Sequence, residues 1–180
     1  MLKKWKNIHS EIVFDHKWFR LRKDTVELPD GVVIDDYIVS ERPDVVLIFP
    51  VTTSGQVIMV EQYKHAAGEI MPEFPGGFIN SSTERPADAA RRELLEETGY
   101  TCESINEIAV VVDNPTKDCN KTHLYMAYGC TLKQKQKLDE TEDISVRVMD
   151  IEAVEHELTH GGIRATLSLA LGLLALMKLQ

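Results

Sequence analysis

The order of the predicted elements indicates a mixed α/β or α+β fold. β-rich segments fill the first third of the chain, a run of good helix formers lies at its centre, and strands followed by two helical segments complete it. The composition, 43% hydrophobic and 27% charged, is typical of a globular domain and excludes a disordered tail or a membrane protein. A length of 180 residues fits one ordinary domain with at most a short appendage.

The N-terminal part of the sequence predicts a meander of antiparallel strands. Short β-rich pieces follow one another between residues 11 and 39. Pro-Asp-Gly at 29–31 supplies a turn between the last two of them. We expect residues 1–44 to form a small N-terminal β region and residues 45–180 to form the main domain.

Two continuous apolar runs, 45–49 and 57–60, open the main domain. Such runs predict central strands that are buried on both faces of a sheet. Thr-Ser-Gly at 53–55 supplies the turn that joins them. We therefore expect the core sheet to begin at these two strands.

A helix is predicted at 87–98, where good helix formers stand between Pro86 and Gly99. The C-terminal run at 163–177 has about a dozen apolar or small residues. A membrane span needs roughly 20, so we expect this run to form a buried terminal helix. The elements after the central helix are three strands and two closing helices, at 108–112, 122–128, 144–149, 151–158 and 163–179.

Charge and cysteine usage exclude several classes of partner. Twenty Lys and Arg against 29 Asp and Glu give a net charge of −9, which repels nucleic-acid backbones. The chain has three cysteines, Cys102, Cys119 and Cys130, and their spacing is not that of a zinc site. So few cysteines, and an odd number of them, fit a reducing compartment better than a disulfide framework. No apolar run follows the N-terminal lysines, so a signal peptide is not expected. We predict a cytoplasmic protein with no nucleic-acid and no membrane partner.

Three glutamates, Glu93, Glu96 and Glu97, share an arc of about 100° on the predicted central helix. A solvated helix face is one explanation for such a run of acids. The glycine-rich approach at 75–77 favours another, because glycine allows a backbone to lie close to an ion and carboxylates suit hard cations such as Mg²⁺. Arg92, four residues before Glu96, can brace one of the acids from the side.

The segment from Gly77 to Glu84, followed after seven residues by 92–100, resembles the Nudix box. Residues 92–100 read Arg-Glu-Leu-Leu-Glu-Glu-Thr-Gly-Tyr and complete the second half of that signature. Six residues separate Gly77 from Glu84 where the usual box has five, which leaves the role of Glu84 open. The resemblance implies a Nudix fold, an α/β/α sandwich with a mixed sheet, and hydrolysis of a nucleoside diphosphate linked to another group.

The flanking segments 60–64, 71–77 and 142–146 are similar to the ADP-ribose and nucleoside-diphosphate-sugar pyrophosphatase branch of that family. Two positions depart from the branch, since Lys64 stands where Arg is common and Gly76 stands where Ala is usual. The resemblance implies hydrolysis of ADP-ribose or a related sugar nucleotide to a nucleoside monophosphate and a sugar phosphate. The implied cofactor is Mg²⁺, with Mn²⁺ as the alternative.

The resemblance also implies three groups of site residues. Glu142 is the candidate general base, with Glu140 as the neighbouring alternative. Ordinary surface roles for Lys64, Glu73 and Glu142 stay open. The groups are the metal ligands Gly76 (through its carbonyl oxygen), Glu93, Glu96 and Glu97, the catalytic residues Glu97, Glu142 and Arg92, and the substrate-binding residues Lys64 and Glu73.

The branch resembled here commonly forms homodimers in which the N-terminal strands of one subunit reach over the other and complete its substrate pocket, so the resemblance implies a homodimer through residues 1–44 that also covers the substrate. The aromatic residues Trp18, Phe19 and Tyr37 can either pack or stack on a base. The four histidines outside the N-terminal region are expected to have core or surface roles, because they lack a metal-ligand spacing. They are His65, His123, His156 and His160.

Two other functions remain open at this point. One is a Nudix hydrolase that acts on nucleoside triphosphates or dinucleoside polyphosphates. The other is a non-catalytic sensor of a nucleotide metabolite, although the full set of Arg92, Glu93, Glu96 and Glu97 argues against it. The preferred base and sugar are not determined by the sequence, because their recognition depends on loop conformation.

Overall fold

The computed structural model of the chain describes residues 1–16, 19–80 and 83–179. The described chain divides into two compact units. The smaller unit comprises residues 1–43 with 112–121, and the larger one comprises residues 44–111 with the chain from 122 onward.

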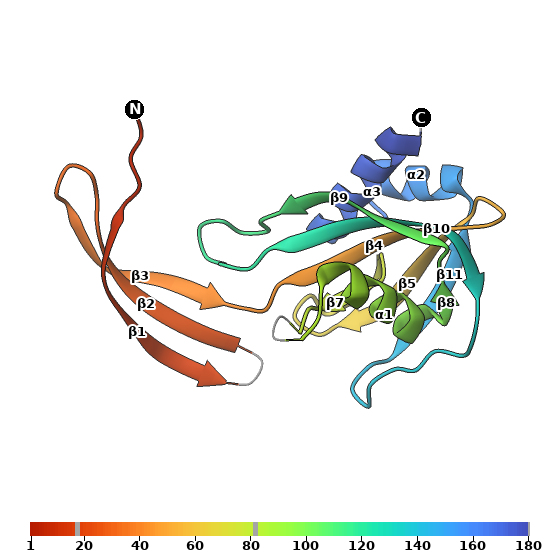
Figure 1. The fold of residues 1–180 in the computed structure, drawn as a ribbon, viewed down its shortest axis with the longest axis horizontal. Helices are drawn as coiled ribbons and strands as arrows, with labels where there is room; N and C mark the ends of the chain where they lie inside the picture. Colours follow the sequence, from red (N-terminus) through yellow and green to blue (C-terminus); the bar gives the residue numbers. More distant parts are fainter. Residues whose placement is uncertain (17–18, 81–82, 180) are drawn as a thin grey trace. The chain divides into compact units, whose positions relative to one another are not determined.

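The smaller unit is a three-stranded antiparallel sheet in the order β1-β2-β3, drawn in red to orange in Figure 1. Its strands are β1 (Lys6–His16), β2 (Phe19–Glu27) and β3 (Val33–Glu41). The predicted meander is confirmed, and a turn at 29–31 joins the last two strands, with Gly31 at φ 90°.

The segment 112–121 belongs to the same unit because β3 holds it. The Tyr37 hydroxyl donates to the Thr116 carbonyl oxygen at 3.0 Å. The Ser40 amide donates to the Lys117 carbonyl oxygen at 2.7 Å, and the Cys119 amide donates back to the Ser40 carbonyl oxygen at 3.2 Å. A loop between two strands of the core sheet is thereby recruited to the N-terminal sheet.

The larger unit is built on an eight-stranded mixed sheet in the order β11-β5-β4-β10-β8. β6 pairs with β5, β7 with β4 and β9 with β10, while β4 and β10 form the parallel pair. The strands are β4 (Val45–Thr52), β5 (Val57–Lys64), β6 (Glu69–Glu73), β7 (Gly76–Phe78), β8 (Tyr100–Thr101), β9 (Ser104–Val111), β10 (Thr122–Leu132) and β11 (Ile144–Met149).

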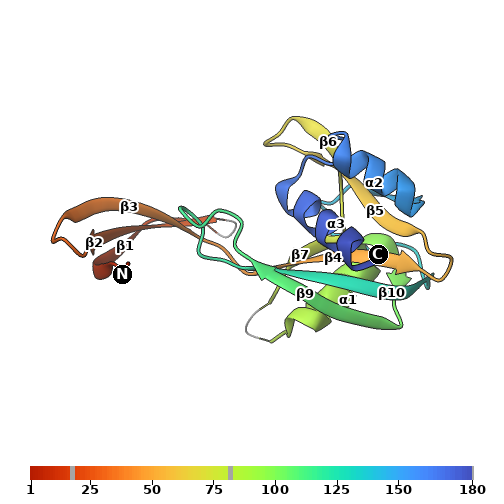
Figure 2. The same cartoon turned by 90° about the horizontal axis from the view of Figure 1, so that it is seen from above.

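Helices cover both faces of this sheet (Figure 2). Along β4, Ile48 packs in one apolar cluster with Leu94 of α1 (Pro86–Thr98). The next residue, Phe49, packs in a second cluster with residues of α2 (Ile151–Thr159) and α3 (Thr166–Leu179). Successive side chains of β4 therefore point into apolar cores on opposite faces of the sheet. This arrangement confirms the predicted α/β/α sandwich with a mixed sheet.

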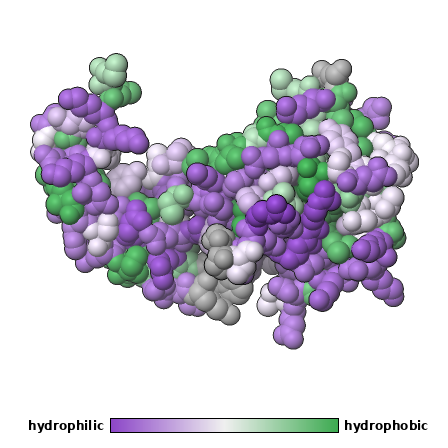
Figure 3. Space-filling model, in the orientation of Figure 1, coloured by the Kyte–Doolittle hydropathy of each residue, from purple (hydrophilic) through white to green (hydrophobic). Residues whose placement is uncertain are grey.

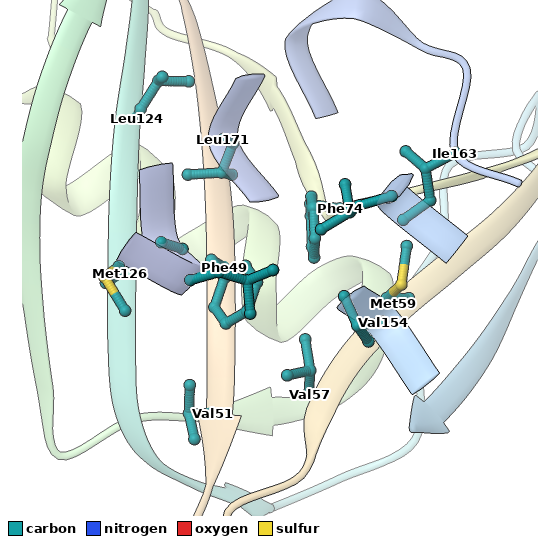
Figure 4. Packing of buried hydrophobic residues seen from close by; sticks show 13 residues of the cluster. Phe49, Val51, Val57, Met59, Phe74, Leu124, Met126, Val154, Ile163 and Leu171 are labelled. Atoms are coloured by element: carbon teal, nitrogen blue, oxygen red, sulfur yellow. The ribbon is translucent and has the colours of Figure 1, made fainter. Parts of the chain in front are cut away.

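The second core is shown in Figure 4, where Phe49 and Phe74 lie near Leu171. The prediction that the terminal helix begins at residue 163 was wrong, since α3 begins at Thr166. Ile163 is instead buried in the core from the connection before α3, and its amide donates to the Glu157 carbonyl oxygen at the end of α2. Within the described residues, every helix is too short or too polar to cross a membrane.

Candidate active site

The helix α1 has clear boundaries and one buried face. Pro86 opens it, and Gly99 ends it in the left-handed conformation at φ 77°, with its amide donating to the Leu95 carbonyl oxygen at 2.9 Å. Ala90 and Leu94 are fully buried against the sheet. Burial of this face, to which Glu97 also belongs, fixes the rotation of the helix and so the directions of its acids.

Glu97 is the most buried of these acids, with only 8% of its surface exposed. Its Oε2 accepts a hydrogen bond from the Gly76 amide at 2.9 Å. Burial raises its pKa to about 8, the amide of Gly76 opposes that shift, and the charges of Glu93 and Glu142 add to it. The structure thus places Gly76 beside Glu97, through its amide.

Glu93 lies one turn earlier and is also largely buried. Burial raises its pKa, while the neighbouring Arg92 acts in the opposite direction. Gly77 packs directly against it, because a Cβ added at Gly77 would overlap the Glu93 carboxylate. We did not predict a role for Gly77 from the sequence beyond the motif, although the Gly-Gly pair was a visible signal that the backbone approaches something closely.

Arg92 binds several carboxylates at once. Its Nη1 lies 2.7 Å from Glu93 Oε1 and 3.1 Å from Glu96 Oε2. Its Nε and Nη2 hold both oxygens of Glu84, at 2.7 and 2.9 Å. This bidentate pair lowers the pKa of Glu84. The extra residue before Glu84 therefore does not remove it from the cluster, and Arg92 braces three acids where the sequence suggested one.

The loop before β11 brings Glu142 to this helix. Glu142 is partly buried, and its charge raises the pKa of both Glu93 and Glu97. Its Oε2 accepts a hydrogen bond from the Asp139 amide at 3.0 Å. Glu140 is exposed. Of the two candidate bases, Glu142 is the one whose charge acts on the helix acids.

Lys64 and Glu73 meet on the β5–β6 hairpin. The Lys64 Nζ lies 2.6 Å from Glu73 Oε2 and donates to Gln62 Oε1 at 2.9 Å. The charge of Lys64 lowers the pKa of Glu97, so this pair belongs to the same region as the helix acids. The structure brings together Gly76, Lys64, Glu73, Arg92, Glu93, Glu96, Glu97 and Glu142.

The other candidates lie elsewhere. His123 Nδ1 is 2.8 Å from Glu107 Oε2, and the ring of His156 on α2 stacks 4.1 Å from that of His160, the residue after the helix, so these histidines have side-chain partners or surface roles. Phe19 and Tyr37 belong to the N-terminal unit, and Trp18 lies outside the described residues.

The donor chemistry of α1 fits a divalent cation. Across residues 1–16, 19–80 and 83–179, no group of three or more His, Cys, Asp or Glu is arranged so that it could hold a metal ion as it stands. Glu97 is nevertheless buried and Glu93 is largely buried, the charge of Glu93 acts on Glu97, and both have raised pKa values. A hard cation relieves both the burial cost and the repulsion, and carboxylate oxygens are the ligands it prefers.

The sandwich fold and the acid-bearing helix fit the class of enzymes whose carboxylates hold a divalent ion. Within that class, residues 41–169 match the model of the NUDIX domain. Residues 5–40 match the model of the nucleoside diphosphate sugar hydrolase N-terminal domain. Because the first match covers more than half of the chain, the protein belongs to the Nudix family, whose hydrolases generally need a divalent metal ion.

The relatives include two bacterial proteins. An ADP-ribose pyrophosphatase of Bacillus subtilis is 33% identical over 148 residues, which cover 82% of this chain and 79% of that protein. A methanol dehydrogenase activator of Bacillus methanolicus is 34% identical over 142 residues, covering 78% and 76%. The fold matches a crystal structure of an ADP compounds hydrolase at a TM-score of 0.85, with 20% identity, over 99% of this chain and 96% of the other.

Proposed function

We propose that the protein hydrolyses the pyrophosphate bond of nucleoside diphosphate sugars, with ADP-ribose as the first substrate to test. The products are then a nucleoside monophosphate and a sugar phosphate. The observation that carries this function is the pair of buried helix acids, Glu93 and Glu97, next to the Gly76–Gly77 backbone. The N-terminal domain match and the relative named ADP-ribose pyrophosphatase support the choice of substrate class.

The residues proposed to hold the metal are Glu93, Glu96, Glu97 and the Gly76 carbonyl oxygen. Mg²⁺ is the proposed ion, with Mn²⁺ as the alternative, because both accept carboxylate and carbonyl oxygens. When bound, the ion supplies charge neutralisation at the diphosphate and lowers the pKa of a coordinated water. Arg92 orients Glu93 and Glu96 through the 2.7 and 3.1 Å hydrogen bonds that its Nη1 donates to them.

Glu142 is proposed as the general base, which takes a proton from the attacking water. Its partly buried carboxylate and its electrostatic influence on Glu93 and Glu97 support that role, because a base must lie close to the reacting atoms. Lys64 is proposed to bind a phosphate oxygen of the substrate. Its ion pair with Glu73 holds the ammonium group in place at the edge of the site.

A homodimer through the N-terminal β region is part of the proposal. Every described residue of β1 is exposed, and its apolar side chains are each about half exposed, namely Ile8, Ile12, Val13 and Phe14. Figure 3 shows such apolar surface between hydrophilic residues in the N-terminal sheet. A small sheet that exposes this much apolar area gains from burial against a second copy. The cytoplasmic location stays a prediction from the sequence.

Product analysis tests the proposed function. With Mg²⁺ and ADP-ribose, the purified protein should release AMP and ribose 5-phosphate, and chromatography identifies both. GDP-mannose, UDP-glucose, nucleoside triphosphates and dinucleoside polyphosphates belong in the same screen. Preferred cleavage of the triphosphates would replace the proposed substrate class. Tight binding of ADP-ribose without product, even at high Mg²⁺ or Mn²⁺, would identify a sensor instead of an enzyme.

A further inference from the structure

The chain that leaves β10 runs back along the last turn of α1. The amide of Lys133 donates to the Gly99 carbonyl oxygen at 2.9 Å, and the amide of Lys137 donates to the Glu96 carbonyl oxygen at 2.9 Å. The last carbonyl groups of a helix have no partners within the helix, so these contacts satisfy groups that would otherwise need water. The segment 133–137 is thereby attached to the turn that carries the site acids.

The side chain of Gln136 makes a second kind of attachment. Its Nε2 donates to the Glu97 carbonyl oxygen at 2.5 Å and to the Ile144 carbonyl oxygen at 3.0 Å. Glu97 lies on α1, and Ile144 is the first residue of β11. One amide group therefore ties the helix to the residue at which the loop 137–143 ends.

The loop 137–143 is the one that carries Glu142. Inside it, the Glu142 amide donates to the Asp139 carbonyl oxygen at 3.0 Å, and the Asp139 amide donates to Glu142 Oε2 at 3.0 Å. These two bonds fix the shape of the turn but attach it to nothing outside the loop. The place of Glu142 relative to α1 consequently depends on the attachments at the base of the loop.

We propose that Gln136 is a positioning residue that closes the base of this loop and so holds Glu142 beside the acids of α1. The inference rests on the proposed function, in which Glu142 is the general base. The chemistry requires a side chain with at least two N–H donors, such as this primary amide, because two carbonyl oxygens are served at once. An ionised carboxylate or an apolar side chain of the same length has no donor for either.

Gln136→Met tests the proposal, and Gln134→Met is the matched control. Gln134 lies in the same segment and is exposed, while methionine keeps the side-chain length in both variants. With ADP-ribose and Mg²⁺, Gln136→Met should lower kcat by about tenfold to a hundredfold and leave KM within about twofold, because a misplaced base slows chemistry more than binding. Gln134→Met should match the wild type.

Two further measurements separate positioning from a loss of fold. Amide hydrogen exchange should speed up in residues 138–143 of Gln136→Met, while the interior of α1 stays as protected as in the wild type. Gln136→Lys restores donors for both carbonyl oxygens and should recover most of kcat. Recovery of the melting temperature by Gln136→Lys without recovery of kcat would reject the positioning role.

Two results would overturn the positioning role of Gln136. Equal kcat values for Gln136→Met and Gln134→Met would overturn the proposal, as would unchanged exchange of the loop in Gln136→Met. Failure of the proposed function has a different signature, because the wild type itself would then release no AMP. In that case the exchange measurement still decides whether Gln136 anchors the loop.

Discussion

Each unit of the protein has an arginine surrounded by carboxylates, and the two clusters differ in charge balance. In the N-terminal sheet, Arg22 holds both oxygens of Asp24, at 2.8 and 3.0 Å, and also pairs with Glu41. Asp24 is almost fully buried, yet its pKa is lowered, mainly by the Arg22 hydrogen bonds. Two acids thus share one strong and well-placed cation.

On α1, one arginine serves more acids. Arg92 binds Glu84, Glu93 and Glu96, while Glu97 has a backbone amide as its hydrogen-bond donor. The pKa values of Glu93 and Glu97 are raised, mainly by burial. The buried Asp24, which has its own arginine, needs no further cation, whereas the acids of α1 outnumber their arginine, and this difference supports the proposal that they hold a divalent ion.

The largest expected effect is on the acid that lacks an arginine. Glu97→Gln should lower kcat with ADP-ribose by at least about a thousandfold, because the proposed function makes Glu97 a ligand of the divalent cation. The fold should persist, since glutamine fills the same space and its amide oxygen can still accept from Gly76. Steady-state kinetics and circular dichroism measure the two results. Activity within tenfold of the wild type would remove Glu97 from the site.

A smaller loss of activity is expected from a change at Gly77, whose backbone packs against Glu93. Gly77→Ala places a methyl group against the Glu93 carboxylate, which must move away. Displacement of about 1 Å in a catalytic group can cost about a hundredfold, so we expect kcat to fall by about that factor. The exposed Gly161 of the α2–α3 connection has open space around its Cβ position but a φ of 82°. Gly161→Ala should therefore affect stability and leave kcat unchanged.

The pH dependence of stability should run in opposite directions for the two clusters. The folded pKa of Glu97, about 8, lies above its unfolded value of 4.5, so the unfolded chain loses this proton first as the pH rises. Without divalent metal, the free energy of unfolding should fall between pH 4.5 and 8. We expect a fall of about 2 kcal/mol, which is less than the full pKa shift implies because the protein and nearby water relax around the new charge. Urea unfolding in EDTA measures it. Glu97→Gln should remove the slope, and added Mg²⁺ should reduce it.

The smallest expected effect concerns the balanced cluster. Because the pKa of Asp24 is lowered in the folded state, its contribution to stability is present above the unfolded pKa and is lost as the pH falls through the folded one. Arg22→Met should remove that acid-side dependence and cost about 1–2 kcal/mol at pH 7, because Asp24 is left without its main partner. Urea unfolding of the variant measures the cost. An unchanged midpoint would mean that water or Ser10 replaces the arginine.

The sequence by itself determined the parts of the protein that depend on neighbouring residues. Pro86 and Gly99 marked the ends of α1, and the spacing of Glu93, Glu96 and Glu97 placed these acids on one side of it, because helix periodicity is a local property. The apolar run of β4 predicted a strand buried on both faces, and the two cores confirm it. The start of α3 was misplaced because an apolar pattern does not tell a buried connection from a helix.

Only the tertiary structure decided which distant groups meet. It brought Glu84 to Arg92 despite the extra loop residue, and it attached 112–121 to the N-terminal sheet. It also placed Gln136 between Glu97 and Ile144, for which the sequence carries no signal. These contacts join residues far apart in the chain, and their strength comes from burial and hydrogen-bond geometry that exist only after the sheet and helices have packed together.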